Sequence, residues 1–323
     1  MLFSAIRKGC IAILALMAGV GAQVPTTPQQ CVANATSGFK QCQGDDSGMV
    51  VAAAAAAVSR PSVFSPYVES WGSLDIGRYP GRSVTLAFLL AGSGGTALAW
   101  DGTMPLDHWL TRAKASKKQI VLSFGGAAGT ELADTDLPPT KLAAEYIRAA
   151  NMYSATRLDF DIEGSGLWDT DTIRKRNAAL VILQKRLPGV KIQYTLPVMP
   201  FGLDSACLAL LSDAKAAGVR LDAVNVMAMN YGDSFREDMG TYAIQAAKAT
   251  RAQLLELGFK NPGVGITPMI LQNDVAVERF SIQDAREVAD FAAKNAWVRF
   301  VGFWAAGRDP NQKFAKLFAS RLP

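Results

Sequence analysis

The chain of 323 residues has a single histidine, His108, and only four cysteines. One histidine cannot build a zinc site alone, and no two cysteines have the spacing of metal ligands. No nucleophile-elbow motif accompanies His108, so a serine or cysteine hydrolase centred on it has no support. The sequence therefore predicts neither a metal nor a cofactor.

Dense basic clusters and long apolar runs are also missing after the N-terminus. The net charge of +5 is mild and is not concentrated in a Lys/Arg run, which gives no support for a nucleic-acid partner. No segment after residue 22 is long and apolar enough to cross a bilayer. Half of the residues are hydrophobic and 19% are charged, as is usual in globular proteins. We expect a monomer without stable membrane association.

The N-terminus has the pattern of a secretory signal. Arg7 and Lys8 precede an apolar stretch from Cys10 to Val20, and Val20-Gly21-Ala22 is a small-residue cleavage site. A membrane anchor is the alternative, but the apolar stretch is short for one. We therefore expect residues 1–22 to be a signal peptide and the mature protein to be secreted, either extracellular or periplasmic.

Residues 23–60 are predicted to form a tail or linker. The segment contains Cys31, Cys42 and an alanine run at Ala52–Ala57. Export favours a disulfide between the two cysteines, closing a short loop outside the main domain. Cys207 instead lies in an apolar helical pattern and is expected to be a buried free thiol.

From residue 61 to residue 323, short apolar segments alternate with amphipathic ones. The expected strands are Val63–Val68, Val84–Leu90, Ile120–Ser123, Leu158–Ile162, Ile192–Leu196, Ala223–Met229, Val264–Thr267 and Phe300–Phe303. The expected helices include Thr172–Arg186, Ala206–Ala217, Tyr242–Leu257, Ile282–Lys294 and Gln312–Ser320. This alternation, with eight strands over roughly 260 residues, predicts a single (β/α)8 TIM-barrel domain. A doubly wound sheet is the rival, but no G-x-G-x-x-G follows the first strand.

The segment Arg157–Gly164 alternates strictly between apolar and acidic residues. On a strand, Asp159, Asp161 and Glu163 share the face toward the barrel interior, with Cα atoms roughly 6.5–7 Å apart. Burial and mutual repulsion favour their protonation, and Glu163 ends the strand at the rim where barrel active sites form. A raised pKa would make Glu163 a proton donor near neutral pH. A solvated edge strand and a Mg²⁺ or Ca²⁺ site are the alternatives.

Several motifs resemble glycoside hydrolase family 18. Asp159-Phe160-Asp161-Ile162-Glu163 resembles its catalytic signature, D-x-x-D-x-D-x-E. Ser123-Phe124-Gly125-Gly126 is similar to the S-x-G-G signature that ends the third strand, and Met227–Gly232 is similar to the sixth-strand motif. Phe64–Val68 and Thr267–Ile270 resemble the bacterial chitinase-D-like branch in particular.

The chain departs from the family pattern at two places. Thr156 replaces the first Asp of the signature, which is expected to remove one buried acid. In the sixth-strand motif, Met229 stands where many relatives have a functional tyrosine, and Asn230 stands at the Asp position. Tyr231 is expected to supply the hydroxyl from the neighbouring position.

The resemblance implies a retaining glycosidase that hydrolyses β-1,4-linked N-acetylglucosamine polymers (chitin), with the acetamido oxygen of the substrate as nucleophile. Glu163 would protonate the leaving oxygen and then activate water. Asp161 would hydrogen-bond the acetamido N–H, and Asp159 would tune Asp161. Asn230 and Tyr231 would orient the N-acetyl group.

The resemblance also implies a set of residues that bind the sugar. Trp304 is expected to lie beneath the sugar whose bond breaks. The other expected binding residues are Tyr67, Trp100, Ser123, Gly125, Gly126, Met227, Met229 and Asn230. The rim aromatics Trp71, Trp168 and Phe201 could extend this platform or could equally be packing residues.

Two other functions remain open from the sequence. A chitin-binding lectin on the same barrel would typically lack the acid that Glu163 provides. An endo-β-N-acetylglucosaminidase acting on N-glycans or peptidoglycan would differ mainly in its loops. Roughly thirty residues lie between Met269 and Arg299, enough for one helix but not for an additional α+β module. The cleft is therefore expected to be shallow, open and endo-acting.

Overall fold

The computed structural model describes residues 62–322. The predicted signal peptide, the tail at residues 23–60 and the Cys31–Cys42 disulfide lie outside the described residues. Within residues 62–322, the only free cysteine is Cys207, which is buried as predicted.

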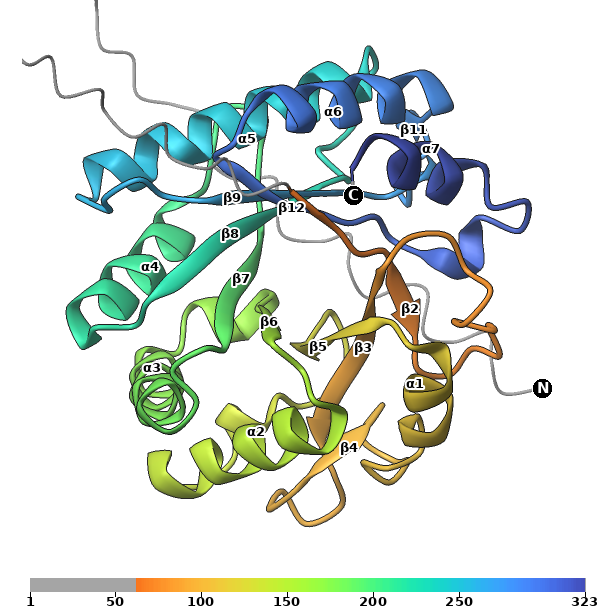
Figure 1. Cartoon of the computed structure of the whole chain (residues 1–323). Helices are drawn as coiled ribbons and strands as arrows, with labels where there is room; N and C mark the ends of the chain where they lie inside the picture. Colours follow the sequence, from red (N-terminus) through yellow and green to blue (C-terminus); the bar gives the residue numbers. More distant parts are fainter. Residues whose placement is uncertain (1–61, 323) are drawn as a thin grey trace, which may run out of the picture. The chain divides into compact units, whose positions relative to one another are not determined.

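Nine parallel strands form a sheet that curls into a barrel (Figure 1). Their bounds are β1 (Val63–Phe64), β2 (Tyr67–Glu69), β3 (Ser83–Ala91), β5 (Gln119–Gly125), β6 (Arg157–Asp161), β7 (Lys191–Pro197), β8 (Leu221–Ala228), β9 (Val264–Pro268) and β12 (Val298–Val301). Their order is β1-β12-β9-β8-β7-β6-β5-β3-β2. A short strand, β4 (Leu98–Trp100), pairs antiparallel with β3 outside this path.

The barrel closes because β1 and β2 are two parts of one extended segment. β1 pairs with β12, whereas β2 pairs with β3 on the opposite side. The change of partner falls at Pro66, which has no N–H to donate and whose carbonyl accepts from the Thr85 N–H at 2.9 Å. Counted together, β1 and β2 complete the eight predicted strands, and the (β/α)8 prediction is confirmed.

Helices cover the outside of the strands (Figure 1). They are α1 (Leu110–Ser116), α2 (Pro139–Tyr153), α3 (Thr170–Arg186), α4 (Ser205–Ala217), α5 (Met239–Glu256), α6 (Ile282–Lys294) and α7 (Lys313–Arg321). Side-chain caps fix several starts. Asp238, for example, accepts from the Thr241 N–H and begins α5 before its first predicted residue, Tyr242.

The outward faces of the strands pack against these helices in one core. Phe124 of β5 stacks on Phe160 of β6 with ring centroids 5.0 Å apart, and Tyr146 of α2 meets both rings edge-on. The apolar residues of the alternating β6 segment therefore face the helices, as predicted. This packing fixes the register of β6, and its acidic residues therefore face the barrel interior.

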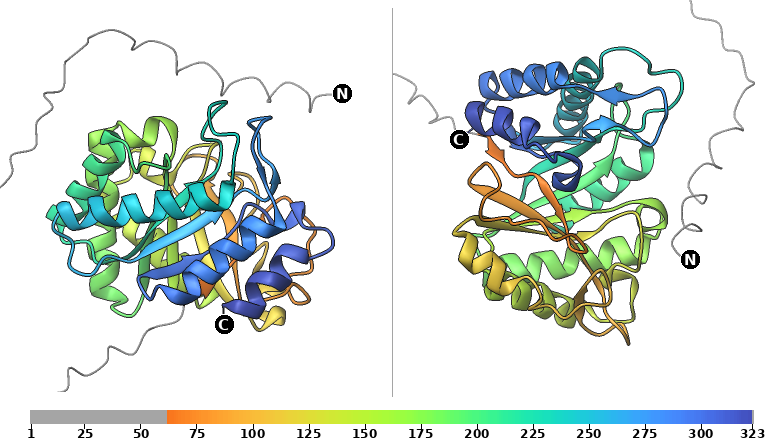
Figure 2. Two further views of the ribbon diagram at one scale, coloured as in Figure 1. Left: turned by 90° about the horizontal axis from the view of Figure 1, so that it is seen from above. Right: turned by 90° about the vertical axis from the view of Figure 1, so that its right-hand side faces the viewer.

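The connection between β9 and β12 is short, as the sequence predicts. It contains a two-stranded hairpin, β10 (Leu271–Gln272) with β11 (Arg279–Phe280), followed by α6. The hairpin and the β8–α5 loop project from the same end of the barrel (Figure 2). That end is where β6 finishes, so both segments border the region of the carboxylates.

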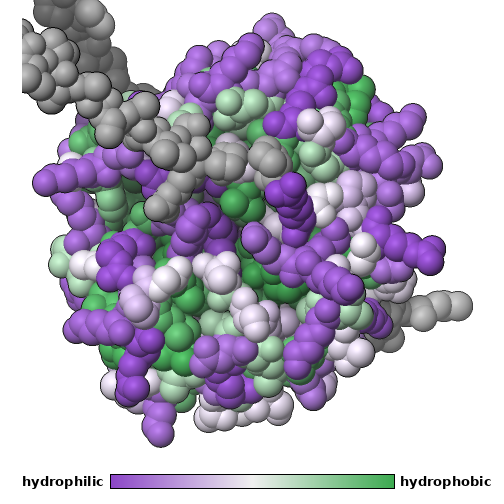
Figure 3. All heavy atoms as spheres, viewed as in Figure 1, coloured by the Kyte–Doolittle hydropathy of each residue, from purple (hydrophilic) through white to green (hydrophobic). Residues whose placement is uncertain are grey.

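The face seen in Figure 3 is mostly hydrophilic, with apolar residues scattered between polar ones. Across residues 62–322, every helix is too short or too polar to traverse a bilayer.

Candidate active site

A cavity of about 170 Å³ lies at the carboxyl ends of the barrel strands. Seven of the predicted site residues line it: Tyr67, Asp161, Glu163, Met227, Met229, Asn230 and Trp304. Six further residues line it that were not predicted as site residues: Phe88, Ala127, Thr195, Thr267, Met269 and Asp274. The structure thus brings residues from eight strands (β2, β3, β5, β6, β7, β8, β9 and β12), or the loops that follow them, into one cleft.

Stacked aromatic rings form the apolar side of this cleft. Trp304 lies parallel to Phe88, with an interplanar angle of 16° and ring centroids 5.5 Å apart. Tyr67 meets the Trp304 ring edge-on at 6.1 Å, and the exposed Trp71 lies 6.4 Å from it. A flat apolar surface of this kind suits the face of a sugar ring.

Gly126 makes room for Phe88. A Cβ added at Gly126 would lie 2.7 Å from the Phe88 ring, and the positive φ of 93° also favours glycine. At Gly125, a Cβ would lie 2.1 Å from the carbonyl oxygen of Asp161. The two glycines therefore position the aromatic ring and β6, and neither lines the cavity.

Asp159 is a fully buried carboxylate that accepts four side-chain hydrogen bonds. Its Oδ1 accepts from Gln193 Nε2 at 2.9 Å and Thr195 Oγ1 at 2.5 Å. Its Oδ2 accepts from Ser123 Oγ at 2.7 Å and the Tyr67 hydroxyl at 2.8 Å. Burial raises the pKa of Asp159, and the four hydrogen bonds oppose that rise. The four hydrogen bonds satisfy both carboxylate oxygens and favour the charged form of Asp159.

A buried arginine lies one step below Asp159 on β6. Arg157 donates to Gln193 Oε1 at 2.9 Å and forms an ion pair with Asp222 at 2.6 Å. Because the same Gln193 amide donates to Asp159, it connects the cation to the acid. Arg157 occupies the next inward position of the alternation, which is the signal that would have identified it from sequence.

Asp159, Asp161 and Glu163 form a ladder of acids that face the barrel interior. Asp161 and Glu163 are a coupled pair at the end of this ladder nearest the rim. Their side chains are hydrogen-bonded to each other, so one of them carries the shared proton. Burial, then the charge of Glu163, then that of Asp159 raise the pKa of Asp161 well above its ordinary value. Burial raises the pKa of Glu163 to about 7, although the hydrogen bond from Asp161 opposes that rise. The pair can therefore deliver a proton at the cleft.

The structure corrects the predictions for three residues. Trp100 is fully buried, and its indole N–H donates to the Leu106 carbonyl at 2.9 Å, so it cannot contact a sugar. Tyr231 packs between Phe235 and Tyr242, outside the cavity lining, so it does not supply a hydroxyl there. Ser123 is buried beneath the cleft and acts on Asp159 rather than on a ligand.

The expectation for Thr156 is also wrong. This residue precedes β6 and is exposed, and its carbonyl accepts from the Lys191 N–H at 2.9 Å. The threonine therefore removes no buried acid. The ladder is complete with Asp159, Asp161 and Glu163, because these are the acids that face the interior of the barrel from this strand.

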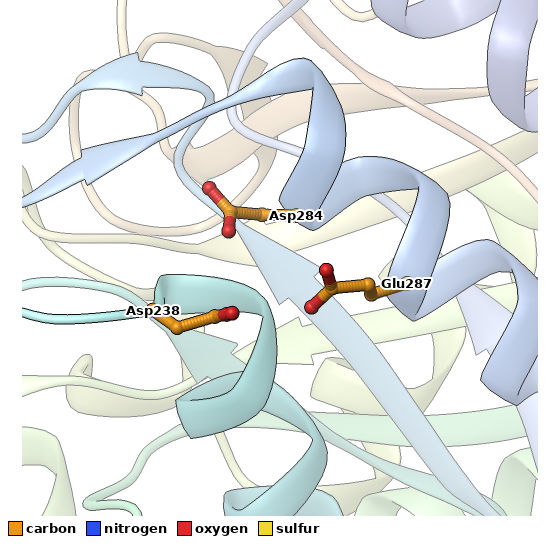
Figure 4. Close-up of side chains that lie close together, drawn as sticks. All are labelled: Asp238, Asp284 and Glu287. Atoms are coloured by element: carbon orange, nitrogen blue, oxygen red, sulfur yellow. The ribbon is translucent and has the colours of Figure 1, made fainter.

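One cluster of acids lies outside the cleft. Asp238, Asp284 and Glu287 have carboxylate oxygens within 4.8 Å of one another (Figure 4). Asp238 caps α5, and Asp284 completes the capping box of α6 with Ser281. Helix capping accounts for the positions of these two acids, so the cluster does not indicate a metal site.

Together, the barrel rim, the proton-sharing carboxyls and the aromatic floor define the class of the site, which has the architecture of a glycoside hydrolase active site. No family model matches the chain. The chain is 32% identical over 249 residues to a probable bifunctional chitinase/lysozyme of Escherichia coli strain K12, covering 70% of this chain and 28% of that protein. It is also 32% identical over 246 residues to endochitinase 11 of Metarhizium anisopliae, covering 70% of this chain and 47% of that protein.

Solved structures of chitinases are also similar to this chain. Active domain 2 of the chitinase from Pyrococcus furiosus is 27% identical, with a TM-score of 0.71, and the match covers 81% of this chain and 95% of that one. A structure of this domain complexed with chito-oligosaccharides has a TM-score of 0.70 at 26% identity. The chain is therefore homologous to chitinases. It spans less than half the length of the curated relatives.

The proton-sharing pair predicts a specific titration. Followed by ¹³C NMR of the side-chain carboxyls, Glu163 should be protonated below its pKa of about 7 and charged above it. Replacing Glu163 by Gln should lower the pKa of Asp161, because the replacement removes the neighbouring negative charge. An Asp161 titration that is unchanged in this variant would contradict the coupling.

Proposed function

We propose that this protein hydrolyses β-1,4-linked N-acetylglucosamine polymers, with Glu163 as the proton donor. The observation that carries the proposal is the buried ladder that ends in the Asp161–Glu163 pair beside the Trp304 floor. A pKa of about 7 keeps a substantial fraction of Glu163 protonated near neutrality, as a general acid requires. The homology to chitinases supports the choice of substrate.

A substrate-assisted route suits this arrangement. Glycosidases with a carboxylate nucleophile place two carboxyls on either side of the scissile bond. Asp161 and Glu163 instead touch each other, so they act from the same side. The acetamido oxygen of the sugar would then attack the anomeric carbon with retention, while Glu163 protonates the leaving oxygen and later activates water. As its own proton moves toward Glu163, Asp161 would accept a hydrogen bond from the acetamido N–H.

The hydroxyls and apolar groups of the cleft would hold the N-acetyl group and the sugar. With Tyr231 turned away, Tyr67, Thr195 and Thr267 provide the hydroxyl groups of the lining. Met227 and Met229 would enclose the acetyl methyl. Asp159 would act through Asp161, because the negative charge of Asp159 contributes to the raised pKa of Asp161 and so helps Asp161 to keep its proton.

The cleft is small beside typical ligand pockets of roughly 300–1,000 Å³. It would hold one sugar firmly, and the rest of the polymer would lie across the open rim. Trp71, Trp168 and Phe201 are 58%, 68% and 74% exposed and are available to stack on further sugars. We propose that these features make the enzyme endo-acting.

We also propose that the protein is a secreted monomer, exported with residues 1–22 as its leader, and that it belongs to the chitinase-D-like branch. The N-terminal charge and apolar pattern support export. The segments Phe64–Val68 and Thr267–Ile270 support the branch. Tyr67 of the first segment and Thr267 and Met269 of the second line the cleft.

Replacing Glu163 by Gln should lower kcat on a chitin hexamer by at least roughly a hundredfold, because the proton donor is lost while the shape is kept. Binding of the hexamer, measured by calorimetry, should persist. Glu237→Gln, an exposed change in the β8–α5 loop, serves as the control and should retain activity. Near-native turnover of Glu163→Gln would exclude the assignment.

The endo-acting proposal predicts the order in which products appear. On a soluble chitin derivative, viscosity should fall early while oligomers of mixed length accumulate, because an open cleft releases the chain after each cut. Size-exclusion chromatography over time measures this. Disaccharide as the sole early product would show an exo-acting enzyme instead.

A further inference from the structure

The cleft has a third acid that the hydrolytic scheme does not use. Asp274 lies in the loop of the β10–β11 hairpin, is exposed and lines the cleft together with Asp161 and Glu163. Among the thirteen described residues of the lining, none is lysine, arginine or histidine. The cleft is therefore acidic, in a protein whose net charge is +5.

Asp274 is held in place by Asn230 from the neighbouring loop. Asn230 Nδ2 donates to Asp274 Oδ2 at 3.1 Å, and the Asp274 N–H donates back to Asn230 Oδ1 at 3.0 Å. Asn230 adopts a left-handed conformation with φ 54°, which asparagine tolerates better than most residues. Asn230, which stands at the Asp position of the family motif, thus positions the carboxylate of Asp274.

The hairpin loop that carries Asp274 is itself tightly bonded. Asn273 Nδ2 donates to the Met269 carbonyl at 2.8 Å, and the Asn273 N–H donates to the Glu278 carbonyl at 3.0 Å. The buried Glu278 accepts from the Gly232 N–H at 2.7 Å and joins the hairpin to the β8–α5 loop. Figure 2 shows the two segments projecting together from the barrel. Asp274 is therefore a preorganised group, which lowers the entropic cost of binding a ligand.

The Asp274 carboxylate is not paired with a cation in the part of the chain that the structure describes. Of the ion pairs found within residues 62–322, none includes this carboxylate. Its side chain accepts a hydrogen bond from the neutral Asn230 amide. An exposed, positioned and uncompensated carboxylate in a cleft favours a ligand that brings a positive charge, and it disfavours one that brings a negative charge.

We propose that Asp274 is a specificity-determining residue that binds the ammonium group of a glucosamine unit, so that the enzyme prefers partially deacetylated chitin. This inference rests on the proposed function. The glucosamine would occupy a subsite next to the catalytic sugar, because the catalytic sugar itself must keep its acetamido group. The same charge disfavours sugars that carry a carboxylate, such as the N-acetylmuramic acid of peptidoglycan.

The test compares products from chitosan of random, partial acetylation with the cleavage of a fully acetylated hexamer. Mass-spectrometric sequencing of the chitosan products gives the frequency of glucosamine at each position from the cut. In the natural protein, glucosamine should be enriched at one fixed position beside the acetylated sugar. The enrichment should decrease with added salt, which screens an exposed charge pair.

Asp274→Asn should reduce that enrichment about fivefold, the upper range for an exposed ion pair. The control is Glu256→Gln, the same loss of one charge at the exposed end of α5 remote from the rim, and it should keep the enrichment. Equal enrichment in Asp274→Asn and the natural protein overturns the inference. Cleavage of the hexamer without any enrichment in the natural protein also overturns it and leaves the proposed function standing. Failure to cleave either substrate would overturn both.

Discussion

The charge on Asp159 is the constraint on which the rest of the site depends. A carboxylate at the centre of a barrel is costly unless every lone pair is satisfied, and here donors from β2, β5 and β7 each contribute. Those donors can meet only if the strands close into a barrel with the observed register. Burial, the charge of Glu163 and then that of Asp159 raise the pKa of Asp161, which keeps a proton beside Glu163.

The buried polar network extends beyond the three acids and includes a cation, Arg157, deeper in the barrel. Arg157 reaches Asp159 through the Gln193 amide and is itself neutralised by Asp222. Asn225 donates to Thr195 at 2.9 Å and accepts from Thr267 at 3.0 Å, which extends the network to β8 and β9. Because these groups are buried and bonded to one another, the carboxyls of the cleft are held rigidly in position.

The two sides of the cleft are built by different means. The aromatic side depends on close packing, since Phe88 can stack on Trp304 only because Gly126 has no side chain. The part beside Asp274 depends on hydrogen bonds between loops, in which Asn230 and Glu278 hold the hairpin that carries Asp274. The short β9–β12 connection contains this hairpin and α6, and the hairpin borders the cleft together with the β8–α5 loop.

Local pattern by itself determined the barrel, the inward face of β6 and the position of Glu163 at its end, because a period of two assigns each residue to a face without reference to the rest of the chain. The resemblance to family 18 motifs, rather than local pattern, identified Trp304, Met227 and Met229 as site residues. Local pattern could not show that Trp100 is buried, that Tyr231 turns away or that Thr156 is exposed. Those outcomes depend on which neighbours surround each side chain. Nor could it predict that Phe88, Thr195 and Asp274 line the cleft. Barrel closure and hydrogen bonds between loops bring these residues together, and their local sequence carries no signal of that contact.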